Sequence, residues 1–512
     1  MGPLGTTLKH QDITGERRKE DESNLCVMCA ASSFAWMEPL TQWLKTEVNA
    51  TTSDISWLAS SVEFSDVVFV VPCSLLADRW GRRTVLLLIG PLCLISWALA
   101  VFTRGLIYLY IVRSIQGVIL GVVFSVAPMY TAEISSSKIR GCLGANFSVM
   151  WFLGTLYTYA TGHYSSYQYY IMYLAIIPLV FFITFIFMPE SPHYYFMVND
   201  NTRAASAMKW LRSGEDISKE FTVTQKAVLN DMKQKGSWVD LFATRSDRRA
   251  FYIVQIVAFV RYMSGLTAII AFASDTFASD GDQQIKPEQF TLIMGSVLCI
   301  SAFFSSFLAD TVGRRRLLIY STIGAAISNL CIAIYFFLQE KTSFNVQTIV
   351  WIKYLGVLSF CILSNIGFGQ LIQTVQAEFF PTHTRCIGGA VTGITSAIFA
   401  FIHLKLYHIF IEVFGVYMNF LTFSLVSLIG AIMTIKYIPE SANKSLAEVN
   451  DNIKKIIDVP LIEATVSAVG NEDIESLLKQ GATSLLNGTI QPVLKPSAKV
   501  SKKAGGAITA VL

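Results

Sequence analysis

Long apolar segments alternate with short polar ones along most of the chain. Twelve of these segments approach or exceed the ~20 residues that an α-helix needs to cross a bilayer. They cover residues 24–44, 55–77, 84–103, 106–131, 142–161, 168–188, 251–278, 289–309, 317–338, 347–374, 388–411 and 417–438. Lipid offers no hydrogen-bond partner to an exposed backbone, so each segment is predicted to be a helix. The pattern therefore predicts an all-α membrane protein with twelve transmembrane helices.

The same pattern divides the chain into five parts. We expect a cytoplasmic N-terminal tail at 1–23, a six-helix bundle at 24–188, a cytoplasmic helical linker at 189–250, a second six-helix bundle at 251–438 and a cytoplasmic, largely disordered tail at 439–512. The linker mixes charges with apolar residues at helical spacing, and the tail is poor in aromatic residues. Since no cleavable signal precedes the first apolar segment, we expect that segment to act as a signal anchor.

One polar motif occurs twice, at matching places in the two predicted bundles. The pattern Asp-x-x-Gly-Arg-Arg at residues 78–83 recurs at residues 310–315, each time between two apolar segments. Many secondary transporters are built from two related halves of this kind. Glycine permits a tight turn, and ion pairs at such turns can hold two bundles together on one side of the membrane.

Further charges repeat near the same predicted face. A glutamate followed by an arginine ends the fourth and tenth segments, and Pro-Glu-Ser ends the sixth and twelfth. We predict a cytoplasmic gate made of Asp78, Arg82, Arg83, Glu133, Arg140, Glu190, Asp310, Arg314, Arg315, Glu378, Arg385 and Glu440. The alternative is that the arginines only follow the general excess of positive charge on the cytoplasmic side.

Composition and charge support this interpretation and exclude others. The chain is 53% hydrophobic and 15% charged, whereas soluble proteins carry about a quarter charged residues. The net charge is +4, with no basic stripe, so nucleic acid is not an expected partner. Most Lys and Arg residues fall on one predicted side, which places both termini in the cytoplasm. Asn49, in Asn49-Ala50-Thr51, would then lie outside as a glycosylation site. No cysteine falls in a predicted outer loop, so free thiols are expected.

Taken together, the motifs resemble those of the sugar porters of the major facilitator superfamily. The chain is most similar to the insect facilitated trehalose transporter-like members, through the sequences at 189–195 and 444–448, and Arg113 to Gly117 match the family's fourth span. The resemblance covers about residues 24 to 450. It implies facilitative transport of a sugar, a hexose or a disaccharide such as trehalose, across the plasma membrane. Two bundles would alternate around one central site, in a monomer without cofactor, metal or enzymatic activity.

The predicted binding cavity departs from the family pattern. The Gln-Gln-x-Ser-Gly-x-Asn run of span seven reads Arg-Tyr-Met-Ser-Gly-Leu-Thr at 261–267, and Gly-x-Gly-Pro-x-Pro-Trp of span ten reads Gly-Phe-Gly-Gln-Leu-Ile-Gln at 367–373. Most of the amides and the stacking tryptophan are therefore absent. Without the two prolines, span ten is expected to be a more regular helix. Matching the family positions gives the expected substrate-binding residues Ser148, Arg261, Tyr262, Thr267, Gln370, Gln373 and Ser396.

Charged residues inside the spans leave two interpretations open. Arg261 lies deep in span seven, where an unpaired charge is costly. It would either contact an anionic group of the substrate or form a structural pair with Glu63 or Asp66. Glu38, at the outer end of span one, could pair with Arg113. The family's proton-coupling acid is absent from span one, so coupling to protons is not expected.

The remaining chemistry is sparse, and three functions stay open. The spacing of His163, His193, His383, His403 and His408 predicts no metal site or catalytic triad, and each is expected to be a surface or packing residue. The first hypothesis is a facilitative sugar transporter. The second is a transporter of a non-sugar solute, for example an anionic one that binds Arg261. The third is a sensor relative that keeps the gate and does not transport.

Overall fold

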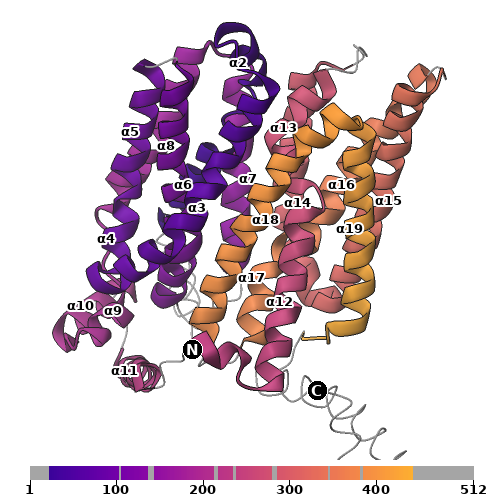
Figure 1. Cartoon of the computed structure of the whole chain (residues 1–512). Coiled ribbons are helices and arrows are strands. Elements are labelled where there is room, and N and C mark those ends of the chain that lie inside the picture. The colour runs from indigo at the N-terminus through magenta and orange to yellow at the C-terminus, as the bar shows by residue number, and fades with distance from the viewer. Residues whose placement is uncertain are drawn as a thin grey trace, which may run out of the picture. The chain divides into compact units, whose positions relative to one another are not determined.

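The computed structural model describes residues 22–102, 105–135, 143–212, 217–233, 238–278, 285–343, 346–380 and 384–441. All of them belong to one compact unit, Met1–Lys444. The second unit, Ser445–Leu512, lies outside the described residues, as do the predicted disordered tail beyond 441 and most of the N-terminal tail. The described part is helical and contains no strand, which confirms the predicted all-α class (Figure 1).

The first half holds the helices of the first six predicted spans. They are residues 22–35, α2 (Thr41–Glu47), α3 (Thr52–Trp80), α4 (Arg82–Leu87), α5 (Ile89–Phe102), α6 (Leu106–Ile134), α7 (Leu143–Gly162) and α8 (Tyr167–Phe185). The linker follows with α9 (Pro192–Met197), α10 (Asn201–Leu211), α11 (Ser218–Lys233) and the short helix η2 (Trp238–Phe242).

The second half holds the helices of the other six predicted spans. They are α12 (Arg245–Met263), α13 (Leu266–Ala278), α14 (Pro287–Val312), α15 (Arg314–Lys341), η3 (Val346–Ile349) with α16 (Val350–Ile366), α17 (Phe368–Phe379), α18 (Arg385–Val413) and α19 (Val416–Tyr437). Among the described residues, ten helical stretches are long and apolar enough to cross a membrane. The other two predicted spans are residues 22–47, interrupted by a turn, and α7.

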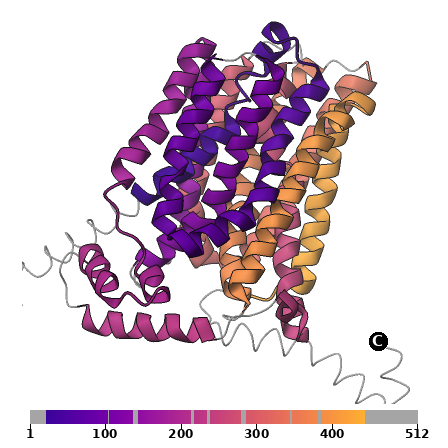
Figure 2. The same ribbon diagram turned by 60° about the vertical axis from the view of Figure 1, so that its left-hand side comes forward.

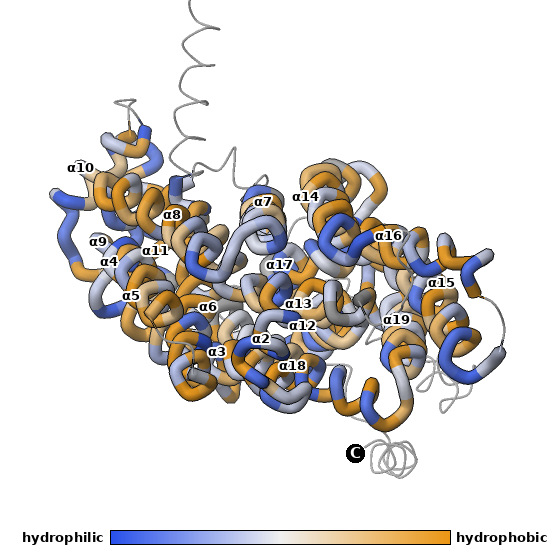
Figure 3. The backbone as a smooth tube through the Cα atoms, turned by 90° about the horizontal axis from the view of Figure 1, so that it is seen from above, coloured by the Kyte–Doolittle hydropathy of each residue, from blue (hydrophilic) through white to orange (hydrophobic). Residues whose placement is uncertain are grey.

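The two halves stand side by side and meet along two helix pairs. α3 packs along α18 on one side, and α7 packs along α14 on the other. Seen along the helix axes, α12, α13 and α17 lie near the centre, between these pairs (Figure 3). The linker helices α9, α10 and α11 gather at one end of the molecule (Figure 2). Phe196 of α9, Met208 of α10 and Val228 of α11 belong to one small apolar core there.

Both central spans of the second half are broken, although each was predicted as one continuous helix. Span seven breaks at Ser264 and Gly265, where Gly265 has φ +109°. Span ten breaks between α16 and α17 at Gly367, which has φ −104° and ψ −106°. The expectation of a more regular span ten is therefore wrong. A Cβ at Gly367 would lie 1.9 Å from Ser321 Oγ, so the glycine lets the broken backbone pack directly on α15.

Within the first half, α6 approaches α3 through glycines. A Cβ added to Gly117 would lie 2.3 Å from the backbone oxygen of Val62, and one added to Gly121 would lie 3.1 Å from Asp66 Oδ1. Small residues allow such close packing of helices in membranes. The contact positions the face of α3 that carries Glu63 and Asp66. The cysteines whose side chains are described are free thiols.

We predict that Gly117→Ala destabilises the protein by about 1–3 kcal/mol, because a backbone atom that cannot rotate away occupies the position of the new methyl group. Thermal unfolding in detergent would measure the loss. Gly393→Ala is the matched control, since its nearest neighbour would be Val70 Cγ2 at 3.7 Å. Equal unfolding temperatures for the two variants would contradict the prediction.

Candidate functional site

The two Asp-x-x-Gly-Arg-Arg turns have the same backbone geometry. Gly81, between α3 and α4, has φ +94°, and Gly313, between α14 and α15, has φ +95°. Only glycine adopts this conformation without strain. A Cβ on Gly81 would lie 2.2 Å from Glu190 Oε2, and one on Gly313 would lie 3.0 Å from Glu440 Oε2. Glycine is therefore needed both for the backbone conformation of the turn and for the close approach of a glutamate. We call this side of the molecule the motif end.

Each of these glutamates binds the start of the helix that follows the turn. Glu190 Oε1 accepts hydrogen bonds from the backbone N–H of Arg83 and of Ser191, both at 2.9 Å. Glu440 Oε1 accepts from the backbone N–H of Arg314 at 3.0 Å and of Ser441 at 3.1 Å. A carboxylate is favoured at a helix N-terminus, where the N–H groups lack partners. Burial raises the pKa of Glu190, against the opposing effect of these hydrogen bonds.

The first arginine of each turn forms an ion pair with a glutamate of its own half. Arg82 Nε lies 3.3 Å from Glu133 Oε2, and Arg82 Nη2 lies 3.1 Å from Asp78 Oδ1. Arg314 Nε lies 3.0 Å from Glu378 Oε1. Ser191 Oγ also donates a hydrogen bond to Glu133. These ion pairs join α3, α4 and α6 in one half, and α15 and α17 in the other.

The second arginine of each turn binds a neighbouring helix end. Arg83 Nη2 donates to the carbonyl of Ile186 at 2.6 Å, and Arg315 Nη2 donates to that of Ile435 at 2.8 Å. Nine of the twelve predicted gate residues thus have described contacts, and the two halves match in their paired interactions. Arg140 and the side chains of Asp310 and Arg385 lie outside the described residues.

Hydrogen bonds between the two halves gather at the opposite end, near α2 and α13. Glu38 Oε1 accepts from the backbone N–H of Ser274 at 2.9 Å, and Glu38 Oε2 lies 3.3 Å from His163 Nε2. The His163 ring is also hydrogen-bonded to Thr291 of α14, at 2.8 Å. Tyr159 Oη donates to the carbonyl of Ile270 at 2.6 Å. His163 was expected to be a surface or packing residue, but it forms polar contacts with Glu38 and Thr291.

The possible pair of Glu38 with Arg113 is not formed. Arg113 is 1% exposed. It donates to the backbone oxygens of Ser33 at 2.7 Å, Leu58 at 3.0 Å and Ala59 at 3.3 Å. The backbone turn after residue 35 carries Glu38 toward α13 instead. Neutral backbone carbonyl groups therefore bind the guanidinium of Arg113.

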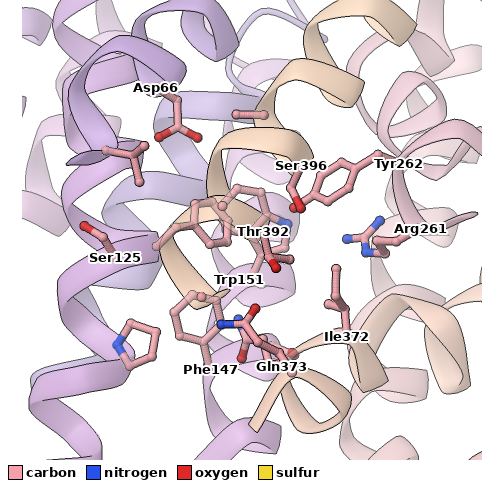
Figure 4. A pocket seen from close by; sticks show the side chains of 18 of the residues that line it. Asp66, Ser125, Phe147, Trp151, Arg261, Tyr262, Ile372, Gln373, Thr392 and Ser396 are labelled. Carbon is pink, nitrogen blue, oxygen red and sulfur yellow. The ribbon is translucent and has the colours of Figure 1, made fainter. Parts of the chain in front are cut away.

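Between the halves lies a cavity of about 440 Å³ (Figure 4). Helices from both halves line it: residues 22–35, α3, α6 and α7 from the first, and α12, α13, α17 and α18 from the second. All seven residues expected to bind substrate are in its lining: Ser148, Arg261, Tyr262, Thr267, Gln370, Gln373 and Ser396. Their role in binding stays a prediction.

Three charged side chains belong to the described lining of this cavity: Glu63 and Asp66 from α3, and Arg261 from α12. Arg261 Nε donates to the carbonyl of Gly369 at 3.1 Å, and its guanidinium lies 5.4 Å from the centre of the Tyr262 ring. Its Nη1 is buried without a hydrogen-bond partner. Among the residues with described side chains, no ion pair joins Arg261 to either acid. The structural pair considered above is therefore not formed in this conformation.

An aromatic wall in the first half was missed by the sequence reasoning. Phe34, Phe124, Phe147 and Trp151 line the cavity together. The Trp151 ring lies 5.2 Å from Phe124 and 5.8 Å from Phe34, and Phe124 lies 5.7 Å from Phe147. The spacing of Phe147 and Trp151, four residues apart beside Ser148, could have indicated it. The cavity thus has an aromatic platform, although span ten lacks one.

Polar groups lie mainly on the second half. Gln373, Gln376, Thr392 and Ser396 line the cavity, and Figure 4 shows Gln373, Thr392 and Ser396 on the side away from Ser125. Gln370 donates from Nε2 to Asn365 Oδ1 at 2.9 Å, so part of its amide is already used. These side chains offer donors and acceptors of the kind that hydroxyl groups require.

The other predicted residues lie away from the cavity. Asn49 is exposed, with φ +54°, just before the capping box of α3. His403 packs against Phe423 with ring centres 5.0 Å apart, and His408 packs against Phe272 at 4.5 Å. His383 lies outside the described residues. In the described part of the chain, no group of His, Cys, Asp or Glu is arranged to hold a metal ion.

Comparison with known proteins agrees with this architecture. The structure matches the major facilitator superfamily proton:xylose symporter XylE, bound to 6-bromo-6-deoxy-D-glucose, with a TM-score of 0.72 and 17% identity over 86% of this chain and 99% of that one. This likeness identifies the fold as that of the major facilitator superfamily. A family model described as "Sugar (and other) transporter" matches residues 14–452. The chain therefore belongs to the sugar transporter family.

Two curated relatives show the range of the family. The facilitated trehalose transporter Tret1 of Apis mellifera ligustica is 25% identical over 427 residues, covering 81% of this chain and 84% of the relative. The facilitated glucose transporter member 6 of solute carrier family 2 from Mus musculus is 24% identical over 416 residues, covering 77% of this chain and 81% of the relative. The chain is thus a multi-pass membrane protein related to facilitative sugar transporters.

We predict that Arg82→Ala lowers the free energy of unfolding by about 3–5 kcal/mol, because it leaves the largely buried Glu133 without its cation. Arg79→Ala is the matched control. Arg79 is exposed in the same turn, so its loss should cost less than about 0.5 kcal/mol. Unfolding in detergent followed by intrinsic fluorescence would compare the two variants. Similar losses would show that the ion pair contributes little.

Proposed function

We propose that this protein is a facilitative transporter that moves a sugar across the membrane by alternating access. The observation that carries the proposal is the central cavity, because residues of both halves line it and any relative motion of the halves must reshape it. Turn motifs with matching contacts lie at the motif end of each half, and hydrogen bonds between the halves gather at the other end. Such an arrangement supports two states, each closed at one end.

The lining of the cavity suits a sugar. A sugar that leaves water needs a partner for each hydroxyl group, since an unpaired buried polar group costs about 1–3 kcal/mol. Gln373, Thr392 and Ser396 offer such partners from the second half. Trp151 and Phe147 offer the C–H face of a sugar ring an apolar surface from the first half. In this proposal the substrate lies between the two walls and contacts both halves, so closure at either end depends on its presence.

The proposed orientation places the motif end in the cytoplasm, with both termini, and the Glu38 end outside. Loop charges support it, because Lys and Arg concentrate at the motif end. We propose the plasma membrane as the location, glycosylation at Asn49, a monomer, and transport rather than enzymatic catalysis. The hydrogen bonds of Glu38 and His163 would then close the cavity to the outside. The gate role of the motif-end charges is part of this proposal.

A simple anion is a poorer substrate for this cavity. The described part of its lining holds two carboxylates and one guanidinium, so with all three ionised an added negative charge would meet net repulsion. The sensor hypothesis predicts no transport at all, and flux measurements separate it from the proposed function.

We predict saturable uptake of radiolabelled glucose or trehalose by purified protein in liposomes, running down the sugar gradient until both sides are equal. Trp151→Ala should lower kcat/KM by about five- to tenfold, because it removes the aromatic platform. Trp351→Ala is the matched control, since that tryptophan is 55% exposed on α16 and does not line the cavity. No sugar flux by the wild-type protein would refute the proposed function.

A further inference from the structure

Two carboxylates stand side by side on the wall of the cavity that α3 forms. Glu63 and Asp66 are three residues apart, so they share one face of the helix. They are 6% and 7% exposed, and both belong to the cavity lining. Figure 4 shows the Asp66 carboxylate directed into the cavity from the first half.

Neither acid forms an ion pair within the described residues, although Glu63 lies near the cations Arg113 and Arg261. Asp66 Oδ1 is buried without a hydrogen-bond partner. Within the described residues, Glu63 forms neither a hydrogen bond nor an ion pair, and the nearby cation Arg113 is bound to carbonyl oxygens. Two adjacent carboxylates repel each other in a low-dielectric site. Unpaired buried charges are expensive in a membrane protein and mark functional sites.

The opposite wall of the cavity carries a positive charge, so the two walls differ in charge. Arg261, from α12, is the one cation in the described lining, and its buried Nη1 lacks a hydrogen-bond partner. With all three groups ionised, the lining carries a net charge of −1. The aromatic wall of Phe34, Phe124, Phe147 and Trp151 lies in the same half as the acids. Aromatic faces attract cations as well as C–H groups. A ligand that matches this cavity carries a positive charge toward the first half and hydrogen-bond acceptors toward Arg261.

We propose that the preferred substrate is a sugar with a protonated amine, whose ammonium group binds between Glu63 and Asp66 while its hydroxyl oxygens accept hydrogen bonds from Arg261. This inference rests on the proposed function and specifies its substrate class. An ammonium group supplies three donors and one positive charge to two acids that have no direct ion-pair partner within the described residues. A neutral sugar leaves the repulsion between the acids in place, and an anionic one adds to it.

The experiment compares three labelled hexoses in liposomes that contain the purified full-length protein. D-glucosamine carries the ammonium group, N-acetyl-D-glucosamine keeps the nitrogen as a neutral amide, and D-glucose has a hydroxyl group there. At a pH where the amine is protonated, we expect kcat/KM for glucosamine to exceed that for the other two by about tenfold or more, equivalent to about 1.4 kcal/mol. Glu63→Gln and Asp66→Asn should each reduce this ratio, and the double variant should bring it close to one.

Two further variants separate charge recognition from general damage. Glu412→Gln removes an exposed carboxylate of α18 outside the cavity and should leave the ratio unchanged. Arg261→Gln should weaken uptake of all three sugars while the preference for glucosamine remains. Thermal stabilisation of the detergent-purified protein by glucosamine gives a second measurement for any acid variant that transports too weakly. The wild-type protein should be stabilised more by glucosamine than by N-acetyl-D-glucosamine, and the double variant should not.

Equal kcat/KM for glucose and glucosamine in the wild-type protein would overturn the inference and leave sugar transport intact. So would a preference for glucosamine that survives in the double variant. Glucose uptake that follows a pH gradient and loses this dependence in Glu63→Gln would show that the acids bind a proton instead. Failure to transport any of the three sugars, or trehalose, would remove the proposed function as well.

Discussion

The hydrogen bonds between a glutamate carboxylate and the first N–H groups of a helix hold each half of this protein together at the motif end. Glu190 binds the start of α4, and Glu440 binds the start of α15. Each glutamate follows the last span of its half, so the bond ties the second, third and sixth helices of that half together. The glycines of the two turns make room for the carboxylates. With these helix ends joined, each half can move as one body around the cavity.

The lining of the cavity departs from the family pattern, whereas the motif-end contacts within each half, which we call the frame, match between the halves. Its seven expected polar residues come together as the family resemblance implies. The aromatic platform, however, is built by α7 and α6 instead of span ten, and two acids of α3 join the lining. The frame must preserve contacts within each half, whereas the lining must match only its ligand. A transporter can therefore keep its frame while its substrate class changes.

Most of the fold followed from local sequence patterns. Apolar length and the requirement that helices satisfy their own backbone bonds predicted the spans, and the repeated turn predicted two related halves. The predictions that proved wrong concern features that are set by contacts between residues far apart in the sequence. Span ten breaks at Gly367, where its backbone packs directly on α15, although both prolines are absent. Glu38 binds Ser274 and not Arg113, because the turn after the first helix redirects its side chain. Trp151 was missed because a single family position was expected to supply the ring.

What the sequence by itself determined is the membrane-spanning helical fold, its duplication and the residues of the turns, because each depends on the chemistry of neighbouring positions along the chain. What only the tertiary structure decided is which partner each buried charge meets. Arg82 and Arg83 are adjacent in sequence, yet one pairs with Glu133 and the other with the carbonyl of Ile186. Arg261 and the acids of α3 face one cavity without pairing. Ion pairs and hydrogen bonds act over a few ångströms, and such distances are set by helix packing rather than by position in the sequence.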